Sequence, residues 1–155
     1  LKKKDEGKLD LRGGEAAEDL GFKVFRLAKP NIRPWSADAD RKPDAYAEKL
    51  GLFNDPLAPA WKAENVLYEI ALREGCGLNT RFERKELANG NIVFEVVDPD
   101  RETPRKFTVC LDEEIRADFT RCYELDADDL FVCRDKALDD SAAANLALQC
   151  RLKTI

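Results

Sequence analysis

The sequence predicts an α+β fold built around a mixed β-sheet, and three observations lead to this class. Residues 63–74 repeat apolar side chains at helical spacing. Residues 79–97 contain two strand-like runs around an Asn-Gly pair. Residues 106–152 then alternate strand, helix, strand and helix, which makes the two strands parallel neighbours. The expected order is α-β-β-β-α-β-α with a C-terminal parallel βαβ unit, preceded by an N-terminal strand and a Pro-rich arm.

The beginning of the chain has little that could form a core. Residues 1–20 form a polar tail, and residues 22–27 place apolar side chains on both faces of an extended segment, as in a strand that is partly buried on both sides. The sequence starts with Leu and contains no Met. We therefore expect it to be a fragment or a processed product of a longer chain.

An arm or linker follows this predicted strand. Pro30 and Pro34 prevent regular structure, because proline lacks an N–H and restricts the residue before it. A short helix is expected at residues 45–50, where a glycine follows. Residues 21–60 are therefore interpreted as a strand plus a Pro-rich linker, and residues 61–155 as the folded domain.

Residues 63–74 are the strongest predicted helix. Gly75 is placed to cap its C-terminus, and the apolar residues of one face are Val66, Leu67, Ile70 and Ala71. Residues 79–97 predict a hairpin whose turn lies at Asn89-Gly90-Asn91, because Asn and Gly accept the positive φ angles of such turns. Residues 106–111 predict the third strand.

The C-terminal part predicts two more helices and one more strand. Residues 112–123 carry three acids in the first turn, where the helix dipole favours them, and one face holds Ile115, Phe119 and Cys122. Residues 130–134 predict the fourth strand. Residues 139–152 predict a closing helix whose inward face is formed by Ala143, Leu146, Ala147 and Cys150.

Charge and cysteine content exclude several classes of protein. The net charge is −5, with +3 in residues 1–35 and −8 in residues 36–155. This second part is too acidic to bind phosphate groups over its whole surface. No apolar run reaches the length of a membrane span, and we expect a cytoplasmic protein without a membrane partner. The five cysteines are widely spaced without a CxxC pair, and the chain has no His, which argues against a zinc site and for reduced thiols.

Only one arrangement of residues suggests catalytic chemistry. Without His, a Ser/His or Cys/His pair is excluded, and neither phosphate-binding glycine motif is present. Asp112 and Asp135 each follow a strand of the βαβ unit, where two carboxylates can hold Mg²⁺. This leaves open a metal-dependent phosphotransfer or nuclease-like domain. The alternative is that Asp112 caps a helix and Asp135 is a solvated loop acid.

Two further features could belong to binding surfaces. Arg81, Arg84 and Lys85 lie on the hairpin beside an aromatic residue, a pattern that occurs in nucleic-acid binding, although neighbouring glutamates dilute it. They are candidates for direct DNA contact or for an ordinary solvated strand face. Trp35 and Trp61 flank the arm, and each would anchor it to the core or to a partner.

Ordered tracts of the sequence resemble the C-terminal portion of type III restriction–modification DNA methyltransferases, which methylate adenine at N6. These tracts are GFKVFRL (21–27), NIRPW (31–35), ENVLYEIALREGCGLNTRFE (64–83), TVCLDEEI (108–115) and DDSAAANLALQCRLKTI (139–155). The family's F-x-G-x-G motif for S-adenosylmethionine and its D-P-P-Y tetrad for the target base are both missing. The resemblance therefore assigns no catalytic, cofactor-binding or metal residue to this chain.

The resemblance implies a non-catalytic assembly domain of a larger bacterial enzyme. S-adenosylmethionine and DNA would be bound by the parent enzyme, which would act as a homodimer and in some systems with a restriction subunit. Self-association would use exposed apolar positions on one of the predicted helices, 63–74 or 139–152, or the two tryptophans. The interface candidates are Trp35, Trp61, Leu67, Ile70, Leu146 and Leu148.

Overall fold

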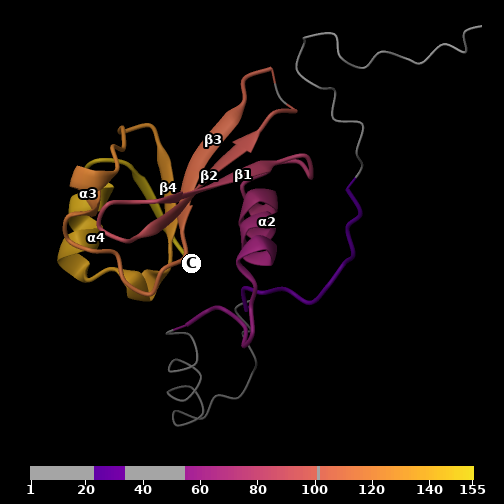
Figure 1. The fold of residues 1–155 in the computed structure, drawn as a ribbon, viewed down its shortest axis with the longest axis horizontal. Coiled ribbons are helices and arrows are strands. Elements are labelled where there is room, and N and C mark those ends of the chain that lie inside the picture. The colour runs from indigo at the N-terminus through magenta and orange to yellow at the C-terminus, as the bar shows by residue number, and fades with distance from the viewer. Residues whose placement is uncertain (1–22, 34–54, 101) are drawn as a thin grey trace, which may run out of the picture.

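A five-stranded mixed sheet forms the centre of the structure, a computed structural model that describes residues 23–33, 55–100 and 102–155 (Figure 1). The strands lie in chain order and are β1 (Arg81–Glu86), β2 (Ile92–Asp98), β3 (Arg105–Cys110), β4 (Leu130–Cys133) and β5 (Arg151–Thr154). Strands β1, β2 and β3 are antiparallel neighbours, whereas β3, β4 and β5 run parallel. The predicted α+β class and the parallel unit are confirmed.

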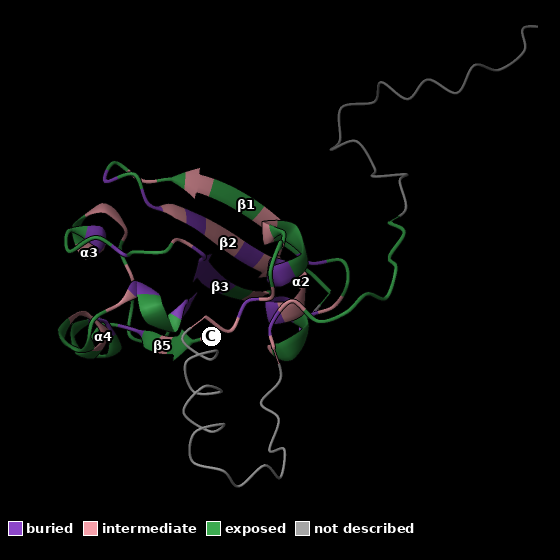
Figure 2. Ribbon diagram, turned by 90° about the horizontal axis from the view of Figure 1, so that it is seen from below, coloured by how far each residue is buried: buried purple, intermediate pink, exposed green. Residues whose placement is uncertain are grey.

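The two faces of the sheet pack against different helices, because side chains alternate along each strand. Helix α2 (Ala63–Arg73) covers the face that carries Val96, Val109 and Val132. Helices α3 (Phe119–Cys122) and α4 (Asp140–Ala147) cover the opposite face, where a second core is formed. Figure 2 shows the purple, buried residues of the central strands between these two layers.

Helix α2 forms as the spacing of its apolar residues predicts. All four apolar residues of the predicted face are buried, and Gly75 follows with a φ of 77°, the left-handed conformation that ends many helices. Glu74, the C-cap residue, forms ion pairs with Arg105 of β3 at 3.3 Å and with Lys153 of β5. These contacts fix the end of α2 to two strands of the sheet.

The hairpin is also confirmed, with Gly90 in the left-handed region at φ 84°. The helix predicted for residues 112–123 is wrong in extent, because only the four residues of α3 are helical. Ile115 and Phe119 are buried as predicted, whereas Cys122 is half-buried. Hydrogen bonds from the hairpin turn hold residues 112–116 in a loop instead.

The helix predicted for residues 139–152 ends early, at Ala147. Asp139 caps it, with its side chain accepting a hydrogen bond from Ala142 N at 2.7 Å. The chain then enters β5, which pairs with β4 and which the sequence did not predict. Of the predicted inward face, Leu146 and Cys150 are buried, Ala143 is half-buried and Ala147 is exposed.

The N-terminal strand is not formed over residues 23–27, which have no sheet partner. In this region a single bridge joins Ile32 to Leu57, flanked by hydrogen bonds from Arg33 N to Pro56 O and from Ala58 N to Asn31 O. The helix predicted for residues 45–50 lies outside the described residues. The described N-terminal segment therefore runs beside the domain rather than within its sheet.

Candidate functional site

The two candidate metal ligands lie at the same edge of the sheet, as predicted. The pairing of Cys110 with Cys133 places Asp112 and Asp135 beyond the ends of neighbouring parallel strands. The Asp112 carboxylate accepts hydrogen bonds from Asn91 Nδ2 and Ile92 N, both at 2.8 Å. Across the described ranges, no three His, Cys, Asp or Glu side chains are grouped so that they could hold a metal ion. Asp112 thus holds the hairpin turn, and a metal site remains a prediction.

The basic residues of the hairpin are not brought together. Arg81 and Lys85 lie on the face of β1 opposite to that of Arg84, because side chains alternate along a strand. Lys85 forms an ion pair with Glu95 at 2.7 Å, and Arg84 lies 3.5 Å from Glu86. The positive charge of this strand is therefore divided between two faces and accompanied by carboxylates.

The interface candidates separate into core residues and one surface residue. Leu67, Ile70 and Leu146 are buried in the two cores, where they contribute to packing inside the chain. Trp61 is half-buried beneath the Arg134 guanidinium, and Trp35 lies outside the described residues. Leu148, at the end of α4, is 84% exposed.

An exposed apolar surface lies outside the six predicted interface residues. Residues 23–33, here called the strap, cross the outer side of α2. Between the strap and α2 lies a groove of about 630 Å³, whose apolar lining includes Phe25, Leu27, Pro30, Tyr68, Leu72 and Leu78. Leu27 is 99% exposed, and Val24, Leu72 and Leu78 are also exposed. A search for helical or strand periodicity misses this surface, because half of it comes from an irregular segment.

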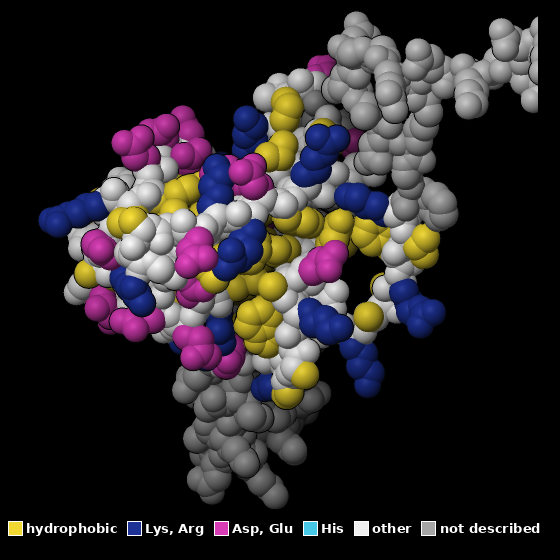
Figure 3. All heavy atoms as spheres, viewed as in Figure 1, with side chains coloured by type: hydrophobic (Ala, Val, Ile, Leu, Met, Phe, Trp, Pro, Cys, Tyr) yellow, Lys and Arg dark blue, Asp and Glu magenta, His cyan; other side chains and the backbone are white. Residues whose placement is uncertain are grey.

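Two sets of contacts hold the strap at its ends. At one end Lys23 Nζ lies 3.4 Å from both Tyr68 Oη and Thr80 O, and the Phe25 ring meets the Tyr68 ring edge-on at 5.2 Å. At the other end the Glu69 carboxylate accepts hydrogen bonds from Asn31 N at 2.7 Å and Ile32 N at 3.2 Å. Figure 3 shows the strap standing away from the body between these points, with an opening beside it.

Charge is distributed unevenly over the molecule. The strap contains Lys23, Arg26, Lys29 and Arg33 and no acidic residue. Residues 112–140 contain eleven Asp or Glu and four Lys or Arg. In Figure 3 blue side chains accordingly accompany the strap, while magenta side chains gather at the opposite end, over the region of α3 and α4. The surface thus combines a basic, apolar end with an acidic end.

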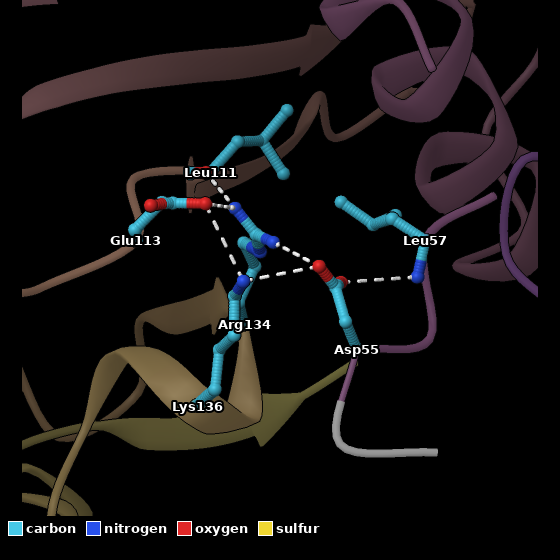
Figure 4. Close-up of polar contacts among 6 residues, drawn as sticks. All are labelled: Asp55, Leu57, Leu111, Glu113, Arg134 and Lys136. Carbon is cyan, nitrogen blue, oxygen red and sulfur yellow. Dashed lines mark hydrogen bonds and ion pairs between the residues drawn. The ribbon is translucent and has the colours of Figure 1, made fainter. Parts of the chain in front are cut away.

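A buried arginine joins the segment before α2 to β4 (Figure 4). Arg134 is only 2% exposed, and its Nη2 donates to Asp55 Oδ2 at 2.7 Å. Glu113 lies 3.6 Å from Arg134 Nη1, and Lys136 Nζ contacts both carboxylates, at 3.0 Å from Asp55 and 3.4 Å from Glu113. Partial burial acts to raise the pKa of Asp55, but the hydrogen bonds from Lys136 and Arg134 outweigh it and hold the pKa below its usual value.

A second polar cluster lies on the face of the sheet that α3 and α4 cover in part. Tyr123 Oη lies 2.9 Å from Thr108 Oγ1 and 3.0 Å from Glu95 Oε1. The hydrogen bond from Lys85 lowers the pKa of Glu95, against the effect of partial burial, and the same bond raises the pKa of Lys85. Burial raises the pKa of Tyr123. Each member of this cluster is paired, which is the arrangement expected of a structural network.

Comparison with family models, with curated proteins and with solved structures gives no match for this chain. None of the helices in the described ranges is long and apolar enough to cross a membrane.

Proposed function

We propose that this chain is a non-catalytic assembly domain that binds a further copy of itself through the groove between the strap and α2. The observation that carries the proposal is the exposure of four apolar side chains that line this groove, Phe25, Leu27, Leu72 and Leu78. Contiguous apolar surface of this kind is typical of protein-binding sites, because burying it gains about 25 cal/mol per Å².

The resemblance to type III methyltransferases gives the proposal its biological setting. The domain would belong to a bacterial, cytoplasmic enzyme that transfers a methyl group from S-adenosylmethionine to adenine N6 in DNA. That enzyme would bind the cofactor and the DNA elsewhere, work as a homodimer and, in some systems, associate with a restriction subunit. Sequencing the reading frame upstream of this stretch tests this setting. F-x-G-x-G and D-P-P-Y motifs are expected there, and their absence would remove it.

The assembly function itself is tested by measuring mass in solution. We expect the weight-average mass in sedimentation equilibrium to rise above the 17.5 kDa of one chain as concentration increases. Leu27→Glu should hold the mass near 17.5 kDa at every concentration, because it places a charge in the apolar groove. Since Leu27 is almost fully exposed, the substitution should leave the fold unchanged by circular dichroism.

Thr103→Glu is the matched control. It makes the same change of charge on the exposed loop between β2 and β3, at a residue that does not line the groove, and should associate like the wild type. A wild-type chain that stays at 17.5 kDa at the highest concentration would contradict the assembly function.

A further inference from the structure

The groove between the strap and α2 has the chemistry of a receptor for an apolar side chain surrounded by negative charge. Its lining is mainly apolar, and the charged strap residues that line it, Arg26 and Lys29, are both basic. On the α2 side, the Glu69 carboxylate is already occupied, since it accepts hydrogen bonds from two strap N–H groups and from Arg73 Nη2 at 2.8 Å. The charges that remain to meet a ligand along the strap are therefore positive.

A surface with the complementary chemistry lies at the other end of the same chain. Leu148 is 84% exposed at the C-terminus of α4. Three residues later, Arg151 N donates to Asp129 O at 2.8 Å, so the end of the loop of residues 124–129 meets the chain shortly after this leucine. That loop contains four acidic residues, no basic residue, and mostly exposed side chains. Leu148 and residues 124–129 are together called the acidic corner.

We infer that the groove between the strap and α2 receives the acidic corner of a second copy of the chain, with Leu148 entering the apolar groove and the acids facing the basic strap. This inference rests on the proposed assembly function and names the surface that the groove would bind. A nucleic acid would match the positive charge, but it would leave Leu27 and Leu72 in water. A second copy satisfies both the charge and the apolar lining.

The position of the two surfaces determines how copies would associate. The strap and α2 lie at one end of the molecule, and α3 and α4 lie at the other (Figure 1). A copy that inserts its acidic corner into one neighbour therefore keeps its own groove open for another. Such head-to-tail contacts do not close into a two-chain unit and continue to add chains with concentration. Because the charges are exposed, salt should weaken the contact.

Two variants, each lacking one of the two surfaces, test the inference. Leu27→Glu blocks the groove and keeps the corner, whereas Leu148→Glu blocks the corner and keeps the groove; both positions are exposed, so both variants should fold. We expect the apparent dissociation constant of each variant alone to rise at least about tenfold. An equimolar mixture should form a complex of two 17.5 kDa chains and stop there, because its outer surfaces are blocked.

The charge component is tested separately with Asp126→Lys/Asp128→Lys in the loop of the acidic corner. This double variant should associate more weakly than the wild type at low salt, and about 0.5 M NaCl should weaken the wild type in the same way. Thr103→Lys, an exposed loop position outside both surfaces, is the control for added positive charge.

The outcomes separate this inference from the assembly function on which it rests. If the wild type associates and Leu27→Glu does not, but Leu148→Glu still does, the acidic corner is not the occupant and the assembly function stands. If the wild type forms a symmetric two-chain complex and mixing the two variants does not restore association, the acidic corner is again not the occupant and the assembly function stands. If the wild type is monomeric and binds vesicles of phosphatidylcholine with 30% phosphatidylglycerol through Leu27, both are overturned.

Discussion

At the scale of single residues, the five cysteines differ sharply in their access to solvent. Cys110 and Cys133 lie opposite each other on the neighbouring parallel strands β3 and β4. Burial raises the pKa of each thiol to about 12. Burial also raises the pKa of Cys150 in the same core, and Cys76 is buried in the other. Because the thiolate is the reactive form, these four side chains should be inert in the folded protein. The inward position of Cys150 was expected from the apolar face of the helix predicted for residues 139–152.

Thiol titration tests this difference. With an excess of a disulfide reagent such as DTNB near pH 8, we expect one fast-reacting thiol per folded chain, that of half-buried Cys122. The remaining four should react at the rate at which the protein opens, and all five should react at once in guanidinium chloride. Cys122→Ser should remove the fast phase. Two or more fast thiols would show that the cores are more open than their packing indicates.

At the scale of elements, the sequence predicts those segments whose own pattern decides their structure. Helix α2 and the hairpin are of this kind, since periodicity or turn chemistry specifies them locally. Residues 112–118 are different, because their conformation is set by a side chain about twenty residues away. Asn91 Nδ2 donates to Asp112 Oδ2 and to Glu114 O, both at 2.8 Å, and its Oδ1 accepts from Arg116 N at 3.2 Å. No local pattern contains that information.

Replacing Asn91 tests whether this contact sets the loop. Asn91→Ala should lower the free energy of unfolding by about 2–3 kcal/mol, because the buried amide pairs with Glu114 O and Arg116 N, which would lose these partners, and supplies one of the two hydrogen bonds to Asp112 Oδ2. Urea denaturation measures the change. Asn145→Ala on the exposed surface of α4 is the control, with an expected change within about 0.5 kcal/mol. An effect of Asn91→Ala as small as the control's would mean that the loop holds its conformation independently.

At the scale of the whole molecule, the least predictable features are those that join distant segments. The sequence places the basic and acidic residues in different parts of the chain, but only the fold separates them into opposite ends. The groove between the strap and α2 likewise combines residues 25–31 with a helix about 40 positions later. The order of residues along the chain predicts neither the separation of charge nor the groove. The strap is irregular, so it has no periodicity that would specify which element it contacts. The exposed Leu148 was among the predicted interface residues, and the strap was not.

The Arg134–Asp55 pair is the main polar link between the segment before α2 and the sheet. Arg134 is buried, so loss of its partner would leave a charge poorly compensated, with Glu113 at 3.6 Å as the remaining carboxylate. Asp55 is 42% exposed, which screens the pair and reduces its contribution. We therefore expect Asp55→Asn to lower the free energy of unfolding by about 1–2 kcal/mol at pH 7.

The pH dependence of that loss distinguishes a charge effect from a packing effect. The pKa of Asp55 in the folded protein lies below its ordinary value of 3.8. Its ionisation therefore stabilises the fold fully above pH 3.8, and this stabilisation is lost as the pH falls through the lowered folded pKa. The difference between wild type and Asp55→Asn should be constant from about pH 7 to 5 and should shrink below about pH 4. Urea denaturation across this range measures it, with Asp128→Asn as the exposed control. A difference that persists unchanged to about pH 2.5 would show that Asp55 acts through its shape and not through its charge.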